Sequence, residues 1–291
     1  MTGLIIIAGL VVGSLYALWW RKYRFPPRGY AQALCYHKIS KRFCFEGTWT
    51  TPDRFFSQID FLIDRGYRFI GEDEFLTSIE AATIGAEKML LLTFDDGYTE
   101  VFDYLLPGLE KRTIPFHVFI VTDFAGRENA WDLSLGRRPF RHLSWREVEE
   151  MAGRGASFGS HGATHRDLTR LPNEECAVEL VRSKSALEDI LNAPVRSFSY
   201  PFGRYNDRIK KLARAVGYQA AFSLYPSHPN EVVDRFALRR NGVYVIDTRS
   251  SILRKIERRP FSWFEEIKCR TINGIAVLTP IFKNSSANRD R

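Results

Sequence analysis

Between residues 31 and 245, short apolar runs alternate with segments of helical pattern, and this alternation constrains the fold more than any other feature. The apolar runs predict strands at 31–36, 68–70, 89–94, 116–121, 156–159, 197–200 and 219–223. Strands that alternate with helices form a parallel α/β sheet or barrel, because each connecting helix packs back onto the sheet. The sequence therefore predicts a parallel α/β fold over this range.

The segments between the runs carry recognisable helix signals. Thr51 places a capping hydroxyl before Pro52 at the first helical position, and Ser144 followed by Glu147 fits a capping box. Further helices are predicted over 174–191 and 207–216. Glycine follows three of the helical segments, where it suits a helix C-terminus: Gly66, Gly155 and Gly217.

Polar or turn-forming residues follow four of the predicted strands. These residues are His37, the pair Asp95-Asp96, His161, and the turn 201–203. The carboxyl ends of the strands in a parallel barrel meet on one face, which is where active sites are built. We therefore expect these residues to share one site.

Asp95-Asp96 and the pair His161 and His165 together predict a metal site. One aspartate and two histidines can hold a zinc-like ion and leave positions open for water and substrate. The second aspartate is then available as a general base. Either pair alone is commonly a solvated turn or a chance spacing. The position of both pairs directly after apolar strands indicates a catalytic metal site.

The charge and cysteine patterns narrow the class of partner. The formal net charge is +8, but no basic stripe is interleaved with aromatics in the way that nucleic-acid binding needs. We therefore expect no nucleic-acid partner, and the charge suits a protein that works near phospholipid headgroups. The four cysteines show no CxxC spacing, which favours buried or free thiols and leaves the compartment open.

The N-terminus predicts a single-pass membrane anchor over residues 1–20. Residues 4–20 are apolar and uncharged, end in Trp19-Trp20, and precede a basic linker at 21–30. Without a cleavage motif, an uncleaved anchor is favoured over a signal peptide, and a buried core helix is the alternative. The basic residues after the span favour a cytoplasmic catalytic domain by the positive-inside rule.

Three motifs resemble those of a known family. Residues 93–98 (TFDDGY) match its TFDDG motif. Residues 160–165 (SHGATH) resemble its H-S/T-x-x-H motif, with Gly162 in place of the hydroxyl residue. Residues 199–203 (SYPFG) resemble its third motif, with Ser199 where the family has arginine. On these residues the chain resembles, over about 31–245, the polysaccharide deacetylases, which are the NodB-homology domain of carbohydrate esterase family 4.

Two further segments, residues 34–37 (LCYH) and Thr51-Pro52 leading to Phe55, resemble the subgroup that deacetylates poly-N-acetylglucosamine. The resemblance implies a distorted (β/α)7 barrel. It also implies an extracytoplasmic domain, which opposes the expectation from the basic residues after the span. A deacetylase of this kind would hydrolyse the N-acetyl amide of an amino sugar.

The resemblance also implies roles for residues. The metal ligands would be Asp96, His161 and His165, and the ion would be zinc, with Co²⁺, Ni²⁺ and Mn²⁺ as alternatives. Asp95 would be the general base. The backbone N–H of Phe202 would hold the oxyanion, and Tyr200, beside it in the third motif, would also contact the substrate. Trp131 lies in an aromatic insertion at 124–141 and is expected either to stack on a sugar or to cap the barrel.

Two family residues are absent at their usual places. Ser199 replaces the arginine that orients the base, and we expect Arg240 to supply that contact from another strand. The apolar run at 275–280 lacks the late histidine of the family. We hypothesise that His37 is the general acid, with a structural hydrogen-bonding role as the alternative. His117 is expected in the core.

The sequence therefore predicts a metal-dependent hydrolase that removes N-acetyl groups from N-acetylated amino sugars of a poly-N-acetylglucosamine-like glycan. One alternative is deacetylation of a lipid-linked sugar at the membrane surface. Another is a non-catalytic glycan-binding or assembly protein, and other glycan-synthesis proteins are compatible partners. Residues 246–291 form an extension in which the basic run 249–259 either contacts a membrane surface or packs on the barrel as a helix.

Overall fold

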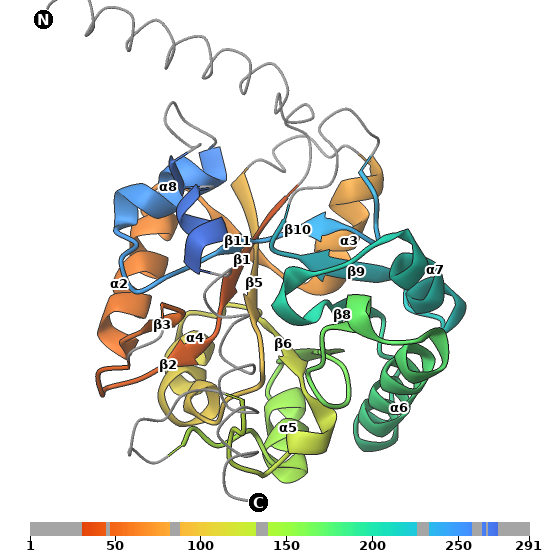
Figure 1. Ribbon diagram of the computed structural model, residues 1–291. Coiled ribbons are helices and arrows are strands. Elements are labelled where there is room, and N and C mark those ends of the chain that lie inside the picture. The colour runs from red at the N-terminus through yellow and green to blue at the C-terminus, as the bar shows by residue number, and fades with distance from the viewer. Residues whose placement is uncertain are drawn as a thin grey trace, which may run out of the picture.

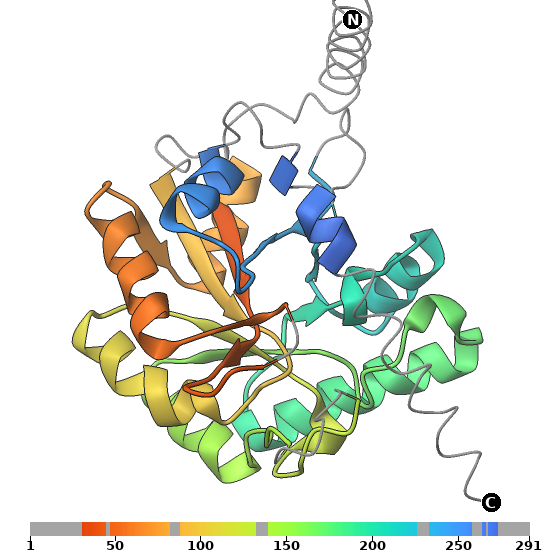
Figure 2. The ribbon, with the colours of Figure 1, turned by 60° about the vertical axis from the view of Figure 1, so that its left-hand side comes forward.

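The computed structural model describes residues 31–44, 47–81, 88–131, 139–225, 233–257, 264–265 and 267–272. Parallel strands form its centre, and helices pack around the outside of them (Figures 1 and 2). Within these ranges the structure contains no helix that is both long and apolar enough to span a membrane. The predicted anchor at 4–20, the linker and the apolar run at 275–280 lie outside the described residues.

All seven predicted strands are present. They are β1 (Gln32–Tyr36), β4 (Arg68–Ile70), β5 (Met89–Phe94), β6 (His117–Ile120), β7 (Ser157–Ser160), β8 (Ser197–Ser199) and β9 (Ala220–Ser223). A separate two-stranded sheet, which the sequence did not predict, pairs β2 (Lys38–Ile39) with β3 (Trp49–Thr50).

The ring of strands is closed by a segment that sequence patterns missed. Two short strands, β10 (Leu238–Arg239) and β11 (Asn241–Gly242), flank Arg240. β10 pairs with β9, and β11 pairs with β1, both in parallel. The sheet order β10-β9-β8-β7-β6-β5-β1-β11 is therefore a near-closed barrel, with one interrupted strand joining its two ends.

The barrel is distorted at β5. Along one edge β5 pairs with β1 through its whole length, from Gln32–Leu90 to Tyr36–Phe94. Along the other edge it pairs first with β4, at Phe69–Leu90, and then with β6, at Thr93–His117. The three-residue β4 ends where β6 begins, so β4 lies outside the ring.

The helices surround the ring and follow the predicted pattern. They are α2 (Pro52–Ile63), α3 (Glu72–Ala81), α4 (Leu106–Lys111), α5 (Trp145–Gly153), α6 (Asn173–Leu191), α7 (Asp207–Ala215) and α8 (Arg249–Glu257). Thr51 caps α2 through the N–H of Arg54, and Ser144 and Glu147 form the predicted capping box of α5. Short helical turns are η2 (Val101–Leu105), η3 (Thr122–Phe124), η4 (Leu168–Arg170) and η5 (Pro201–Gly203).

Side chains alternate between the two faces of the strands and form two cores. The larger core lies between strands and helices. The smaller one contains Ala33, Leu91, Phe119 and Phe222, which point into the barrel. Residues 252, 253 and 256 of α8 belong to the larger core, so the run 249–257 packs on the barrel. The prediction of a packed helix is confirmed for that range.

Candidate active site

The inward-facing positions become polar toward the carboxyl ends of the strands. Cys35 lies two residues after the inward-facing Ala33. Thr93 and Asp95 lie two and four residues after the inward-facing Leu91. The last inward residue of β8, Ser199, is likewise fully buried. Because alternate residues of a strand share a face, these side chains meet at one end of the barrel.

Asp95 is paired with Arg240, as expected from the sequence. The guanidinium donates from Nη1 to Oδ1 and from Nη2 to Oδ2 of Asp95, each at 2.6 Å. It also donates to the hydroxyls of Ser199 at 2.7 Å and Thr93 at 3.1 Å. Both charged side chains are at most 4% exposed. A two-pronged contact of this kind fixes the carboxylate in one orientation.

The interruption of the closing strand explains how Arg240 reaches this place. It lies between β10 and β11, so its side chain enters the barrel at the seam where the last strand meets the first. Ser199 is short enough to leave room for the guanidinium. A larger side chain there would compete with Arg240 for the same buried space.

Arg240 determines the charge of Asp95. Burial alone would raise the pKa of this carboxyl group, but the guanidinium outweighs burial, and the net pKa is well below its ordinary value. Asp95 is therefore an oriented carboxylate throughout the neutral pH range.

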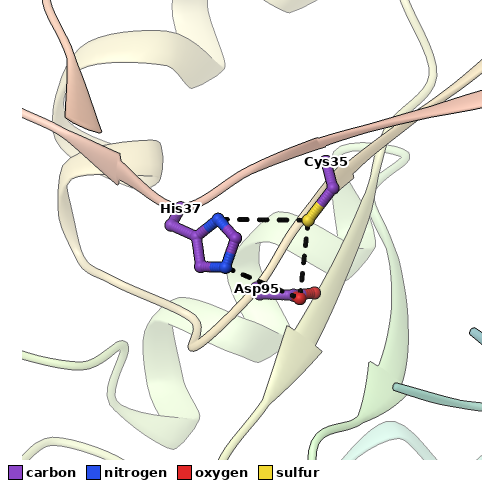
Figure 3. Close-up of side chains that lie close together, drawn as sticks. All are labelled: Cys35, His37 and Asp95. Carbon is purple, nitrogen blue, oxygen red and sulfur yellow. Dashed lines mark hydrogen bonds and ion pairs between the residues drawn. The ribbon is translucent and has the colours of Figure 1, made fainter. Parts of the chain in front are cut away.

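His37 and Cys35 also lie beside Asp95 (Figure 3). His37 Nε2 is 3.9 Å from Asp95 Oδ2, and the Cys35 thiol donates to the same oxygen at 3.4 Å. Burial lowers the pKa of His37 to about 4, so the imidazole is neutral at pH 7. Its proposed role as the acid stays a prediction. Sequence reasoning did not single out Cys35, because its contact depends on pairing between β1 and β5.

Asp96, His161 and His165 converge as a second group beside Asp95. Asp96 Oδ1 is 3.5 Å from His161 Nε2 and 3.3 Å from His165 Nε2. Atoms from the three residues all lie within 4.8 Å of one another. Ligand atoms about 2.1 Å from a tetrahedral ion are ~3.4 Å apart. The spacing therefore fits a zinc-like ion.

The protonation of the histidines also fits metal binding. His161 Nδ1 is 2.8 Å from the carbonyl oxygen of Ser199, which fixes the tautomer with the proton on Nδ1. Burial lowers the pKa of both His161 and His165, so both rings are neutral. A neutral ring with Nε2 unprotonated offers that nitrogen as a ligand.

Cys35, His37 and Asp95 also have metal-ligand spacing, but their surroundings oppose an ion. The Arg240 guanidinium already binds both Asp95 oxygens. Burial raises the pKa of the Cys35 thiol well above its usual value, which disfavours the thiolate that a metal requires. The group of Asp96, His161 and His165 is therefore the candidate metal site.

Trp131, in the described part of the aromatic insertion, packs against the metal group. Trp131 stacks on the ring of His165, with centroids 4.4 Å apart and planes at 19°. His142, which the sequence gave no role, is 2% exposed and lies with Nδ1 2.7 Å from the Asp96 carbonyl oxygen. One face of Trp131 thus packs on a candidate ligand, and this residue forms part of a wall of the site. Contact of Trp131 with sugar stays a prediction.

The third motif divides between the site and the core. Phe202 has φ +58°, and its ring centroid is 4.8 Å from that of His165. Tyr200 is 1% exposed, and its hydroxyl donates to the carbonyl of Phe236 at 2.8 Å. The expectation that Tyr200 contacts substrate is therefore corrected: its side chain stabilises the core. The motif pattern could not reveal this, because Phe236 is distant in sequence.

Comparison with known proteins identifies the domain. Residues 83–221 match the family described as polysaccharide deacetylase. YxkH of Bacillus subtilis, whose name places it among polysaccharide deacetylases, is 28% identical over 208 residues, or 71% of this chain and 69% of the relative. The poly-β-1,6-N-acetyl-D-glucosamine N-deacetylase of Staphylococcus epidermidis is 29% identical over 202 residues. That match covers 65% of this chain and 66% of the relative, which is just under two thirds of its length.

Solved structures agree on the fold. The deacetylase PplD of Streptococcus pyogenes superimposes with a TM-score of 0.66 at 24% identity, covering 78% of this chain and 97% of that one. IcaB of Ammonifex degensii superimposes with a TM-score of 0.62 at 23% identity, covering 79% of this chain and 97% of that one. Over residues 83–221 the chain is similar to the polysaccharide deacetylases, and its relatives indicate an enzyme that hydrolyses an amide bond. His37, which follows β1, and Arg240, which lies between β10 and β11, are both outside the family match.

Proposed function

We propose that this protein is a metal-dependent N-deacetylase of glycans that contain N-acetylated amino sugars, with a poly-N-acetylglucosamine-like polymer as its substrate class. The observation that carries the proposal is the position of Asp95. Arg240 holds this ionised carboxylate beside, and not within, a group of one aspartate and two histidines. Binding a glycan without hydrolysis would not require such a base, so the non-catalytic alternative has less support.

Each residue has a place in the proposed reaction. A divalent ion held by Asp96, His161 and His165 would polarise the acetyl carbonyl and lower the pKa of water. Asp95 Oδ2, which is 3.9 Å from His161 Nε2, accepts the proton of the attacking water. The backbone N–H of Phe202 donates to the carbonyl oxygen as negative charge develops on it, a contribution of about 3–4 kcal/mol where single donors have been removed.

His37 supplies the proton of the departing amine in this scheme. Because the imidazole is neutral at pH 7, it must first receive a proton during the reaction. Asp95 Oδ2 at 3.9 Å is the neighbouring group that can deliver it. The proton taken from water then leaves with the amine, and both side chains return to their initial state.

The relatives whose names specify a substrate support the polymer. The S. epidermidis relative is named for poly-β-1,6-N-acetyl-D-glucosamine, and so is a Staphylococcus aureus relative at 25% identity. The apolar residues 4–20 and the basic linker support a second candidate, a lipid-linked amino sugar deacetylated at a membrane surface. We propose membrane anchoring through this segment in either case.

The deciding test is acetate release by the full chain in detergent after chelation and zinc add-back. Substrates would be β-1,6- and β-1,4-linked N-acetylglucosamine oligomers and an undecaprenyl-type lipid-linked N-acetylglucosamine. Zinc-dependent release from the β-1,6 oligomer is expected. Release from the lipid alone would favour the second candidate, and zinc-independent release would contradict the metal role. No release from any of the three, with zinc bound, would reject the proposed substrates.

A further inference from the structure

The loop that carries both histidine ligands has no regular structure of its own. Residues 161–167 are neither helix nor strand. Gly162 at φ +83° and His165 at φ +60° both adopt left-handed backbone conformations, which is unfavourable for the histidine. The separation of the two imidazoles is therefore set by contacts from outside the loop, and not by helix periodicity.

Glu179 of α6 makes three such contacts. It is 6% exposed, and its Oε2 accepts the N–H groups of Ala163 and Thr164, each at 2.9 Å. Its Oε1 accepts the hydroxyl of Thr164 at 2.5 Å. A carboxylate that binds two consecutive N–H groups fixes the orientation of the peptide units between the two ligands.

The turn at Gly162 fits closely against this carboxylate. A Cβ placed at Gly162 would lie 3.4 Å from Glu179 Oε2. The absence of a side chain at this position, where φ is positive, lets the loop approach α6 without strain. The close approach of Glu179 is thus a second reason, besides the positive φ, why glycine suits position 162.

The other side of the loop is held by η3. The N–H groups of Thr122 and Asp123 donate to the carbonyls of Gly162 at 3.2 Å and Ala163 at 2.9 Å. Arg182, three residues after Glu179 on α6, pairs with Asp123 at 2.6 Å. The ligand loop is therefore clamped between α6 and η3, with Glu179 as the charged, buried half of the clamp.

We infer that Glu179 is a positioning residue that sets the metal affinity of the site through the geometry of the 161–165 loop. The inference rests on the proposed function, because it takes His161 and His165 as ligands. Without the carboxylate, two buried N–H groups lose their acceptor, and the loop must rearrange to satisfy them. That rearrangement changes the separation of the two imidazole nitrogens.

The test compares zinc affinity in the full chain and its variants by competition with a chromogenic chelator. Glu179→Ala is expected to weaken zinc binding about 10–100-fold. Glu179→Gln is expected to lie closer to the wild type, because its amide oxygen accepts the same two N–H groups. Glu174→Ala is the matched control, since Glu174 lies in the first turn of the same helix and its side chain is exposed. It should leave the affinity unchanged.

Cobalt absorption adds a readout of ligand geometry that a general loss of stability would not alter. A changed cobalt spectrum in folded Glu179→Ala is expected. If folded Glu179→Ala has both the zinc affinity and the cobalt spectrum of the wild type, the inference is overturned, while the proposed function is not. If Glu179→Ala does not fold, Thr164→Val decides: it removes one bond of the clamp and should weaken zinc binding by a smaller factor, and wild-type affinity would overturn the inference. A wild-type chain that binds no divalent ion would overturn the proposed function and this inference together.

Discussion

Two buried aspartates, Asp95 and Asp247, bind cations in different ways, and the difference separates chemistry from architecture. Arg240 binds both oxygens of Asp95, and His37 and His161 each lie 3.9 Å from its Oδ2. Asp247 is 0% exposed and enclosed by Lys255, Lys268 and the N–H of Tyr244, which is at 2.8 Å.

Asp247 joins segments that are separate in the chain. Lys255 of α8, which binds its carboxylate, also donates to the carbonyl of Gly242 in the closing strand at 2.7 Å. The backbone carbonyl of Asp247 accepts Arg54 of α2 at 2.6 Å. The network therefore ties the barrel seam to helices on its outside. A buried ion pair by itself thus does not identify a catalytic residue. An ion pair whose carboxylate also lies close to other reactive side chains, as in Asp95, does indicate one.

Asp95→Asn provides the largest test of this comparison. The amide keeps the shape of the side chain but cannot accept the proton of the attacking water, so turnover should fall about 10²–10⁴-fold. Zinc binding should remain, because Asp95 is not among the proposed ligands. Acetate release and chelator competition measure the two quantities. Near-wild-type turnover would exclude Asp95 as the base.

Asp247→Asn should show the opposite pattern. It leaves the buried ammonium group of Lys255 without its counter-charge, while Lys268 keeps Glu265 as a partner. The free energy of unfolding should therefore fall by about 3–5 kcal/mol. Turnover per folded molecule should not change. Urea denaturation and acetate release, measured below the unfolding transition, check both. A selective loss of turnover would assign Asp247 to catalysis and break the distinction.

Arg240→Lys sharpens the comparison within the site. Lysine keeps the charge but cannot bind both oxygens of Asp95 in a fixed plane. A misplaced base should reduce kcat about 10–100-fold. Arg239→Lys is the matched control, because it makes the same substitution at the preceding residue, in β10. Equal kcat values for the two variants would show that orientation by the guanidinium does not matter.

Glu100 is a third carboxylate to compare with Asp95 and Asp247, and its substitution should have the smallest effect of the four. It is partly buried, and burial raises its pKa to about 7, above the ordinary value near 4.5. Between these values the folded chain binds more protons than the unfolded chain, so wild-type stability falls as pH rises from about 4.5 to 7.

Glu100→Gln removes this loss. The variant should be about 1–2 kcal/mol more stable than the wild type at pH 8 and equal to it near pH 4.5. Denaturation midpoints at the two pH values measure the difference. The same stability difference at both pH values would show that titration of Glu100 is not its cause.

Local sequence patterns predicted much of this structure. Seven strands, the caps of α2 and α5, and the convergence of Asp95, Asp96, His161 and His165 at one end of the barrel all agree with the structure. These features depend on periodicity and on residues close together in the chain. Parallel strands then bring their carboxyl ends together whatever their exact order.

Tertiary structure alone decided the rest. The two-residue strands β10 and β11 are too short to show a period, and only pairing with β9 and β1 makes them strands. The Tyr200 hydroxyl donates to a carbonyl 36 residues away in the chain, which holds this side chain in the core. Glu179 binds the ligand loop from a separate helix. Sequence determined which groups could react, because that depends on residue type and local pattern. Folding determined which of them are oriented, since orientation depends on partners that are distant in the chain.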